Sequence, residues 1–150
     1  MEVDITPARK QPGSINYHWM YLSKHDKNKQ TNIQKHIRDV SQSGRINEIK
    51  LLKIWRELNG LDFPSPYLEY LLIDNILLYK SKEADKLEDN FLYILKELAK
   101  DTGNPLFSQI VDPANSANIL SDLLTRAEKY SIISRAKISI VQPHWNQIVW

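Results

Sequence analysis

Hydrophobic residues recur at helical spacing over most of the chain from residue 46 onward. The first such stripe has four members, each three positions from the next: Ile49, Leu52, Trp55 and Leu58. Residues with this spacing lie on one face of an α-helix, so the pattern predicts a helix that begins near residue 46 and packs Trp55 into a core. Asn59-Gly60 is typical of a helix C-terminus and predicts where this helix ends.

A second helix is predicted to begin at Ser65-Pro66, with Ser65 as the N-cap and proline at the first helical position. It runs to about Tyr79 and is apolar on more than one face, which is typical of a central, buried helix. A third helix is predicted to open at Asp85, with Glu88 three positions later as a capping box. Its apolar stripe consists of Leu87, Phe91, Leu95 and Leu98.

The C-terminal part adds a loop and one more helix. Residues 104–118 are rich in turn-forming residues and predict a loop. Thr125 and Glu128 form another capping box, and the helix that follows them ends before Pro143. The pattern therefore predicts four helices between residue 46 and this proline.

The N-terminal part has a different pattern, in which apolar residues alternate with polar ones. Val3-Asp4-Ile5 is a very short alternating segment, and a longer one has apolar or aromatic residues at every second position: Ile15, Tyr17, Trp19 and Tyr21. Alternation of this kind predicts β-strands. The polar segment Lys24–Lys29 predicts a turn, and residues 31–40 predict a short helix capped by Thr31 or Asn32.

The predicted strand at Val3–Ile5 has a consequence for assembly. A strand this short needs partners to be stable, and the residues before it supply none. An unpaired strand is an open sheet edge, which favours pairing with another chain. We therefore expect a homodimer, or a partner chain that meets this strand.

Composition narrows the class of protein. The 150 residues are 42% hydrophobic and 25% charged, a balance typical of one globular domain. Cysteine is absent, which excludes disulfide scaffolds and thiolate metal sites. No apolar run approaches the roughly 20 residues that span a bilayer, and the N-terminus lacks the basic and apolar regions of a signal peptide. We expect a cytoplasmic protein without membrane contact.

Charge is distributed unevenly along the chain. Residues 1–60 carry a balance of +5 and residues 61–150 a balance of −3, for a net charge of +2. A basic N-terminal part suits an anionic partner such as a nucleotide or a nucleic acid, and an ordinary solvated surface is the structural alternative. His18, His25 and His36 also lie there, but their spacings match no compact metal-ligand pattern, so we expect no histidine metal site.

Four segments carry a further pattern. Val3–Arg9 is VDITPAR, and Leu51–Arg56 is LLKIWR. Leu61–Leu71 is LDFPSPYLEYL, and Asp112–Asn118 is DPANSAN. In order and spacing they resemble the third catalytic strand, the h-h-K-x-W helix, the h-P-x-x-Y helix start and the D-P-x-N loop of one enzyme family. That family is the nucleotidyltransferases related to 2′-5′ oligoadenylate synthetases and bacterial cyclic-oligonucleotide synthases.

The resemblance implies a reaction that uses two Mg²⁺ ions clamped between carboxylates. Asp4 would be the third catalytic aspartate and a metal ligand. In the family a Gly-Ser turn and two further carboxylates precede that aspartate, and Gly13-Ser14 does not replace them because His25-Asp26 lies among lysines. One aspartate cannot hold two ions. We therefore expect the chain to be the C-terminal half of such an enzyme, inactive alone.

Three other residues would bind the nucleotide by the same resemblance. Lys53 would reach the triphosphate, Tyr67 would stack on the base of an NTP such as ATP, and Ser65 would contact ribose or phosphate while capping its helix. Each residue also has an interpretation without a ligand: Lys53 as a solvated helix lysine, Tyr67 as an aromatic residue of the core, and Ser65 as a helix cap only. Asp112 and Asn115 are expected to tie their loop to the following helix through bonds to the backbone, without a chemical role.

We expect a mainly α fold, a bundle of about four to six helices after a short N-terminal β remnant of the catalytic sheet. Residues 1–45 would form that remnant, with a hairpin and a connecting short helix, and residues 46–150 the helical domain that binds nucleotide and substrate. The product would be a cyclic or linear oligonucleotide or a nucleotidylated acceptor. The alternative is a stand-alone helical protein-interaction or regulatory module without catalysis. A third interpretation is an RNA-binding domain. The argument against it is that aromatic and basic residues interleave only around Tyr17–Tyr21.

Overall fold

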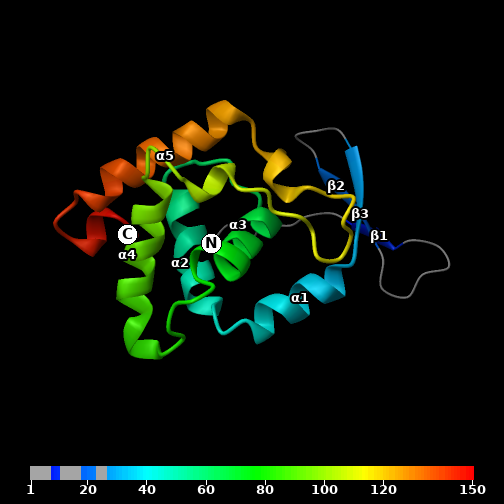
Figure 1. Cartoon of the computed structure of the whole chain (residues 1–150), viewed down its shortest axis with the longest axis horizontal. Helices are drawn as coiled ribbons and strands as arrows, with labels where there is room; N and C mark the ends of the chain where they lie inside the picture. Colours follow the sequence, from blue (N-terminus) through cyan, green and yellow to red (C-terminus); the bar gives the residue numbers. More distant parts are fainter. Residues whose placement is uncertain (1–7, 11–17, 23–26) are drawn as a thin grey trace.

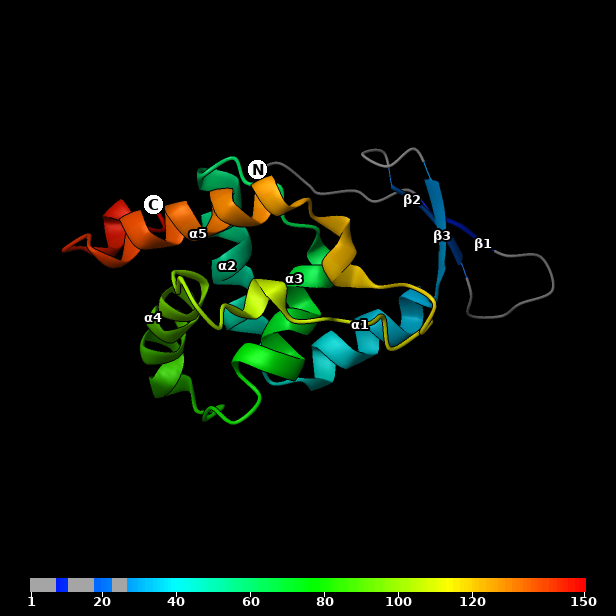
Figure 2. The ribbon, with the colours of Figure 1, turned by 45° about the horizontal axis from the view of Figure 1, so that its top comes forward.

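The computed structural model describes residues 8–10, 18–22 and 27–150. Three short β-strands come first and five α-helices follow, so the predicted mainly helical fold is confirmed. In both views of the ribbon the sheet lies at one end of the molecule, and the helix α4 (Leu87–Leu98) lies toward the other (Figure 1, Figure 2). The strand predicted at Val3–Ile5 falls outside the described residues.

The sheet contains β1 (Ala8–Lys10), β2 (His18–Leu22) and β3 (Lys27–Thr31) in the order β1-β2-β3, with both pairs antiparallel. The strand predicted from the alternating segment is confirmed from His18 onward, and Ile15 and Tyr17 lie outside the described residues. The turn predicted over Lys24–Lys29 is wrong from Lys27 onward, where the backbone pairs with β2. Strand pairing uses backbone groups, and a lysine-rich strand is acceptable at a sheet edge because only one side of it needs a partner strand.

The first two helices agree with their predictions. α1 (Ile33–Gln42) begins after Asn32, whose side-chain oxygen accepts a hydrogen bond of 3.0 Å from the backbone N–H of Lys35. An asparagine in this position satisfies one of the N–H groups that a helix start leaves unpaired. α2 (Ile46–Leu58) is followed by Gly60, which has a φ of 57° and so ends the helix in the left-handed region.

The central helix is shorter than predicted. α3 (Ser65–Leu71) passes into a single π-helical turn, η2 (Leu72–Ile76), and the chain has left the helix before the exposed Tyr79. The predicted N-cap at Ser65 is wrong by one residue: Pro64 occupies the cap, and Ser65 is the first helical residue. Pro66 is therefore the second helical residue and still lies in the first turn. The backbone N–H groups of the first turn have no partner within the helix, so a proline there loses no hydrogen bond.

The third predicted helix is preceded by a short 3₁₀ turn, η3 (Ala84–Lys86), and α4 itself spans Leu87–Leu98. The capping box predicted for Asp85 and Glu88 is wrong. No side chain caps α4, and the Glu88 carboxylate instead accepts a hydrogen bond of 2.6 Å from the indole N–H of Trp145. A residue 57 positions away in the sequence therefore replaced the local partner.

The last helix has the capping box that the sequence predicted. α5 (Arg126–Ile140) is capped by Thr125, whose hydroxyl accepts from the N–H of Glu128, while the Glu128 carboxylate accepts from the N–H of Thr125 at 2.7 Å. The long connection between α4 and α5 contains two short 3₁₀ turns, η4 (Pro105–Phe107) and η5 (Leu120–Leu123).

The hydrophobic core lies between α2, α3, α4 and α5. Trp55 is fully buried there, as predicted, and its indole N–H donates to the hydroxyl of Ser139 at 2.8 Å, which joins α2 to α5. Burying one such large side chain stabilises the fold by about 2–3 kcal/mol. Other residues with no measurable exposure include Leu52, Leu68, Leu71, Ile94, Leu95 and Ile132.

Arg45, between α1 and α2, is a charged residue inside this structure, and 2% of it is exposed. Its guanidinium donates to the carbonyls of Leu77 and Ser81, at 2.7 Å each, and to the carbonyl of Lys80. It also pairs with the Glu48 carboxylate at 3.2 Å. Five fixed N–H donors allow one arginine to satisfy several carbonyls at once. Arg45 therefore fastens the corner between α1 and α2 to the segment that leads into α4.

Replacing Arg45 with methionine, which keeps most of its volume but none of its donors, is expected to lower the free energy of unfolding by about 3–5 kcal/mol. The reason is that the buried Glu48 carboxylate loses its cation and three carbonyls each lose a donor, although Asn90 still donates to Glu48 and to the carbonyl of Ser81. Urea denaturation measures the change. Arg38→Met is the control, because Arg38 is exposed on α1, and its effect is expected to stay within about 0.5 kcal/mol. Similar losses in both variants would contradict the role of Arg45.

Candidate functional site

Lys53 lies on α2, and its ammonium group forms an ion pair with the Glu69 carboxylate on α3 at 2.7 Å. The lysine side chain is 34% exposed and the glutamate side chain 14%. The pair thus joins two helices at a position that solvent and dissolved ligands can reach. Asp4, the residue predicted to bind metal, lies outside the described residues.

Ser65 and Tyr67 lie on the same helix start but face different surroundings. The Ser65 hydroxyl accepts from the guanidinium of Arg56 at 3.0 Å, and Arg56 also donates to the carbonyl of Phe63 at 2.9 Å. Tyr67 is fully buried, and its hydroxyl donates to the carbonyl of Leu106 at 2.9 Å. Burial raises the pKa of Tyr67 well above its ordinary value, so it stays a neutral donor.

The structure therefore brings Lys53, Ser65 and Tyr67 to the junction of α2 and α3, but not into one open cleft. Lys53 is accessible and paired, and Ser65 is half-buried and bonded to Arg56. Stacking of a base on Tyr67 would need a change of conformation that exposes its ring, because the ring has no exposed surface in this arrangement.

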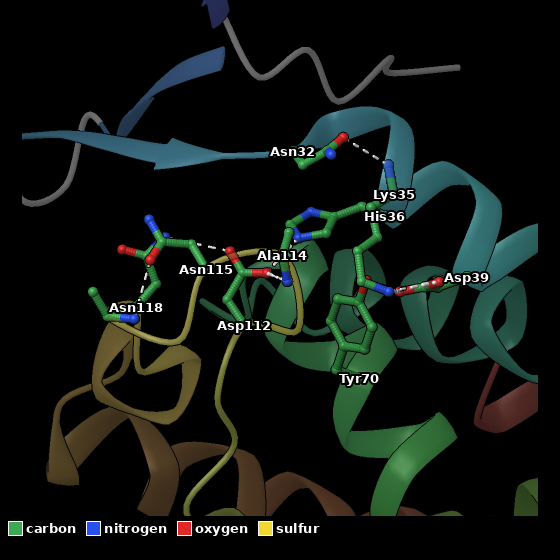
Figure 3. Close-up of polar contacts among 10 residues, drawn as sticks. Asn32, Lys35, His36, Asp39, Tyr70, Asp112, Ala114, Asn115 and Asn118 are labelled. Carbon is green, nitrogen blue, oxygen red and sulfur yellow. Dashed lines mark hydrogen bonds and ion pairs between the residues drawn. The ribbon is translucent and has the colours of Figure 1, made fainter. Parts of the chain in front are cut away.

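A second group of polar side chains, here called the His36 cluster, joins α1 to α3 and to the loop before α5: His36, Asp39, Tyr70 and Asp112 (Figure 3). The Nε2–H of His36 donates to Oδ1 of Asp112 at 2.7 Å. Both side chains are removed from solvent, with 10% of His36 and 1% of Asp112 exposed. The edge of the imidazole packs against the ring of Tyr70, with centroids 5.3 Å apart.

Asp112 is held from several directions at once (Figure 3). Besides His36, its carboxylate accepts from the backbone N–H of Ala114 at 2.8 Å and from the side-chain amide of Asn118 at 3.3 Å. Asn115 accepts from the backbone N–H of Ala117 at 3.1 Å. Bonds from Asp112 and Asn115 to the backbone are therefore present, and those to Ala114 and Ala117 lie within the loop itself.

The other half of the His36 cluster is centred on Asp39. Its carboxylate accepts from the hydroxyl of Tyr70 at 2.8 Å and pairs with the ammonium of Lys35 at 2.9 Å. Burial acts to raise the pKa of Asp39, but donation from Lys35 and Tyr70 outweighs it and lowers the pKa below its ordinary value of 3.8. Burial and the Asp39 carboxylate raise the pKa of Tyr70, which therefore remains a hydrogen-bond donor.

A metal centre is not formed by the residues that the structure describes. Among them no group of three or more histidine, aspartate or glutamate side chains could hold an ion. The Mg²⁺ ions that the family resemblance implies would therefore depend on Asp4 and on carboxylates that the described residues do not supply. No helix in the described ranges is long and apolar enough to cross a bilayer.

Sequence reasoning did not predict the His36 cluster. His36 and Asp112 lie 76 positions apart, and neither belongs to a short motif that contains the other. The one available signal was that His36 falls on the same side of the short amphipathic helix as Ile33 and Val40. A histidine on that side predicts burial, and a buried imidazole needs a polar partner.

Comparisons with known proteins give one informative likeness. No model of a known protein family matches the chain, and no curated protein matches it. Among solved structures it is similar to CdnC of E. coli MS115-1, determined with ATP, with a TM-score of 0.58 and 18% sequence identity. The match covers 89% of this chain and 52% of the CdnC chain, so this chain spans about half the length of CdnC. The likeness shows that the fold is shared with that part of CdnC.

The contribution of the His36–Asp112 hydrogen bond can be measured by a double-mutant cycle with His36→Ala and Asp112→Ala. We expect a coupling energy of about 1–3 kcal/mol, because the bond is buried and one partner is charged. Denaturation of the four proteins gives the value. The half-exposed pair Lys35 and Asp39 is the control, with an expected coupling below about 0.5 kcal/mol. Equal couplings would show that burial adds nothing to the bond.

Tyr70→Phe removes one donor to Asp39 and is expected to cost about 1–2 kcal/mol of stability at pH 7. The folded-state pKa of Asp39 lies below 3.8, so its contribution is present above about pH 4 and is lost as the pH falls through the folded-state pKa. The difference between wild type and Tyr70→Phe should therefore shrink in acid. Denaturation at pH 7, 5 and 3 tests this, with the exposed Tyr79→Phe as the control. A difference that is constant across these pH values would contradict it.

Proposed function

We propose that the chain is the helical, nucleotide- and substrate-binding part of a Mg²⁺-dependent nucleotidyltransferase that makes a cyclic or linear oligonucleotide or nucleotidylates an acceptor. The observation that carries the proposal is the fold shared with CdnC over 89% of this chain. CdnC was determined with ATP, which agrees with the nucleotide expected from the four sequence motifs. Motif order and backbone fold are separate kinds of support.

Lys53 is the residue through which nucleotide binding is proposed to act. Its ammonium is partly exposed and is held at a known position by Glu69, 2.7 Å away. A triphosphate carries more negative charge than one carboxylate, so it competes for this point charge. Ser65 is proposed to contact ribose or phosphate, and Tyr67 to stack on the base after a change of conformation that exposes its ring.

Catalysis is proposed to need more carboxylates than the chain offers at its N-terminal strand. Asp4 would be a metal ligand, and Mg²⁺, when bound, would stabilise the attacking and leaving oxygens of the transfer. A single aspartate does not hold two ions, so the chain alone is proposed to bind NTP without turning it over. Residues 1–45 would belong with the catalytic sheet, and pairing of the N-terminal strand would involve a second copy or a partner chain.

The second candidate is a stand-alone helical interaction module. A specific observation favours it: each nucleotide-binding candidate that the structure describes already has a partner within the chain. Lys53 is paired with Glu69, Ser65 is bonded to Arg56, and Tyr67 is bonded to Leu106 inside the core. In such a module these residues would hold α2 and α3 together and would have no ligand.

ATP binding to the purified chain separates the two candidates. The proposal predicts saturable binding by calorimetry in the presence of Mg²⁺, weakened at least tenfold, or about 1.4 kcal/mol, by Lys53→Ala. Lys50→Ala is the matched control, since Lys50 is an exposed lysine on the same helix, and its effect should be under twofold. Thermal denaturation of both variants checks that they remain folded.

Two outcomes would overturn the proposal. One is no binding at millimolar ATP, and the other is equal weakening by Lys53→Ala and Lys50→Ala, which would indicate a general effect of positive charge. Either result would favour the interaction module. Tyr67→Phe is a further check, because it keeps the ring and removes only the bond to Leu106.

A further inference from the structure

A cavity of about 390 Å³ lies between α2, the start of α4 and the C-terminal 3₁₀ turn η6 (Trp145–Gln147). Its volume is in the range of sites that bind small molecules or single large side chains. Phe91 is buried in its floor, and the indole of Trp145 packs on that ring with centroids 5.8 Å apart. The remaining apolar lining comes from Leu51, Ala84, Leu87 and Val149.

The charged residues that line this cavity are all acidic. Of the described residues that line it, Asp85 and Glu88 are acidic and none is basic. Asp85 has Lys86 3.8 Å away, whereas Glu88 accepts the neutral indole N–H of Trp145 at 2.6 Å. Residues 61–150, which supply most of the lining, carry a balance of −3. An apolar floor beneath a carboxylate rim fits a ligand that is apolar and positively charged.

The cavity is separate from the position proposed to bind nucleotide. Leu51 lines it from α2, and Lys53 lies two positions further along the same helix. Two positions turn a helix by about 200°, so these side chains point to nearly opposite sides of α2. The inference about the cavity therefore does not depend on the proposed function.

We propose that this cavity binds a peptide segment of a partner protein that presents an aromatic or branched apolar side chain next to a lysine or arginine. Its rim residues Ala84, Asp85 and Glu88 are exposed, so a backbone can cross the opening while one side chain enters. The apolar side chain packs on Phe91 and Trp145, and the neighbouring cation pairs with Glu88. A buried aromatic floor with a charged rim is the arrangement that concentrates binding energy at protein interfaces.

The test uses the whole ¹⁵N-labelled chain and two capped peptides, Ac-Gly-Phe-Lys-Gly-amide and Ac-Gly-Phe-Glu-Gly-amide. The indole N–H of Trp145 is the reporter, identified among the four tryptophans by Trp145→Phe. We expect the lysine peptide to shift this resonance saturably and the glutamate peptide to bind at least tenfold more weakly. Glu88→Gln keeps an acceptor for the indole and removes the charge, so it should reduce the preference for lysine at least threefold.

The controls separate the cavity from general electrostatics. Asp89→Asn removes a charge from the same turn of α4 without lining the cavity, and should leave the affinity within twofold. Ala84→Trp fills the opening from an exposed position and should abolish binding. Lys53→Ala should change nothing, which keeps failure of this inference distinguishable from failure of nucleotide binding.

Three results would overturn the inference. The first is no shift of the Trp145 resonance at millimolar peptide, and the second is equal binding of the lysine and glutamate peptides. The third is binding of free phenethylammonium as tight as that of the lysine peptide, which would assign the cavity to a small organic amine instead of a protein partner.

Discussion

The guanidinium of Arg45 joins the start of α2 to the segment that leads into α4. It is buried, and it donates to three carbonyls and pairs with the Glu48 carboxylate, to which the side-chain amide of Asn90 also donates. Removing one partner of a buried ion pair costs about 3–5 kcal/mol, so loss of Arg45 would weaken the connection to the segment after η2. That segment determines where α4 begins. Ala84, Asp85 and Glu88, which follow this segment, line the cavity.

The His36 cluster holds α1 in place at the end of the molecule where the sheet lies. β3 passes into α1 through the single residue Asn32, so whatever holds α1 also determines where the sheet can lie. His36 holds the Asp112 loop, and Tyr70 joins the same helix to α3 through Asp39. Because the bonds come from three separate parts of the chain, α1 is held to α3 and to the loop before α5 by polar contacts.

Ligand binding is proposed at α2 and α3, whose contacts with each other differ from those of Arg45 and the His36 cluster. The two helices are joined by Lys53 and Glu69 and by Arg56 and Ser65, contacts that are only partly buried. Partly exposed ion pairs contribute little to stability, commonly under 1 kcal/mol. Such a pair can exchange a carboxylate for a phosphate at small cost, whereas the contacts of Arg45 and His36 cannot. The difference in burial separates residues suited to binding from residues suited to support.

The sequence by itself determined the number and approximate limits of the helices, because apolar periodicity and capping residues such as Asn32 and Thr125 act within one turn of backbone. It also determined that Trp55 is buried and that the four motifs occur in the order of a nucleotidyltransferase. It did not determine the partners of Arg45, His36 or Glu88, nor the burial of Tyr67. Those contacts join residues that are tens of positions apart, and a periodic pattern holds no information about which distant group will satisfy a buried charge. Only the tertiary structure decided them, because each buried polar group takes the partner that packing brings within reach.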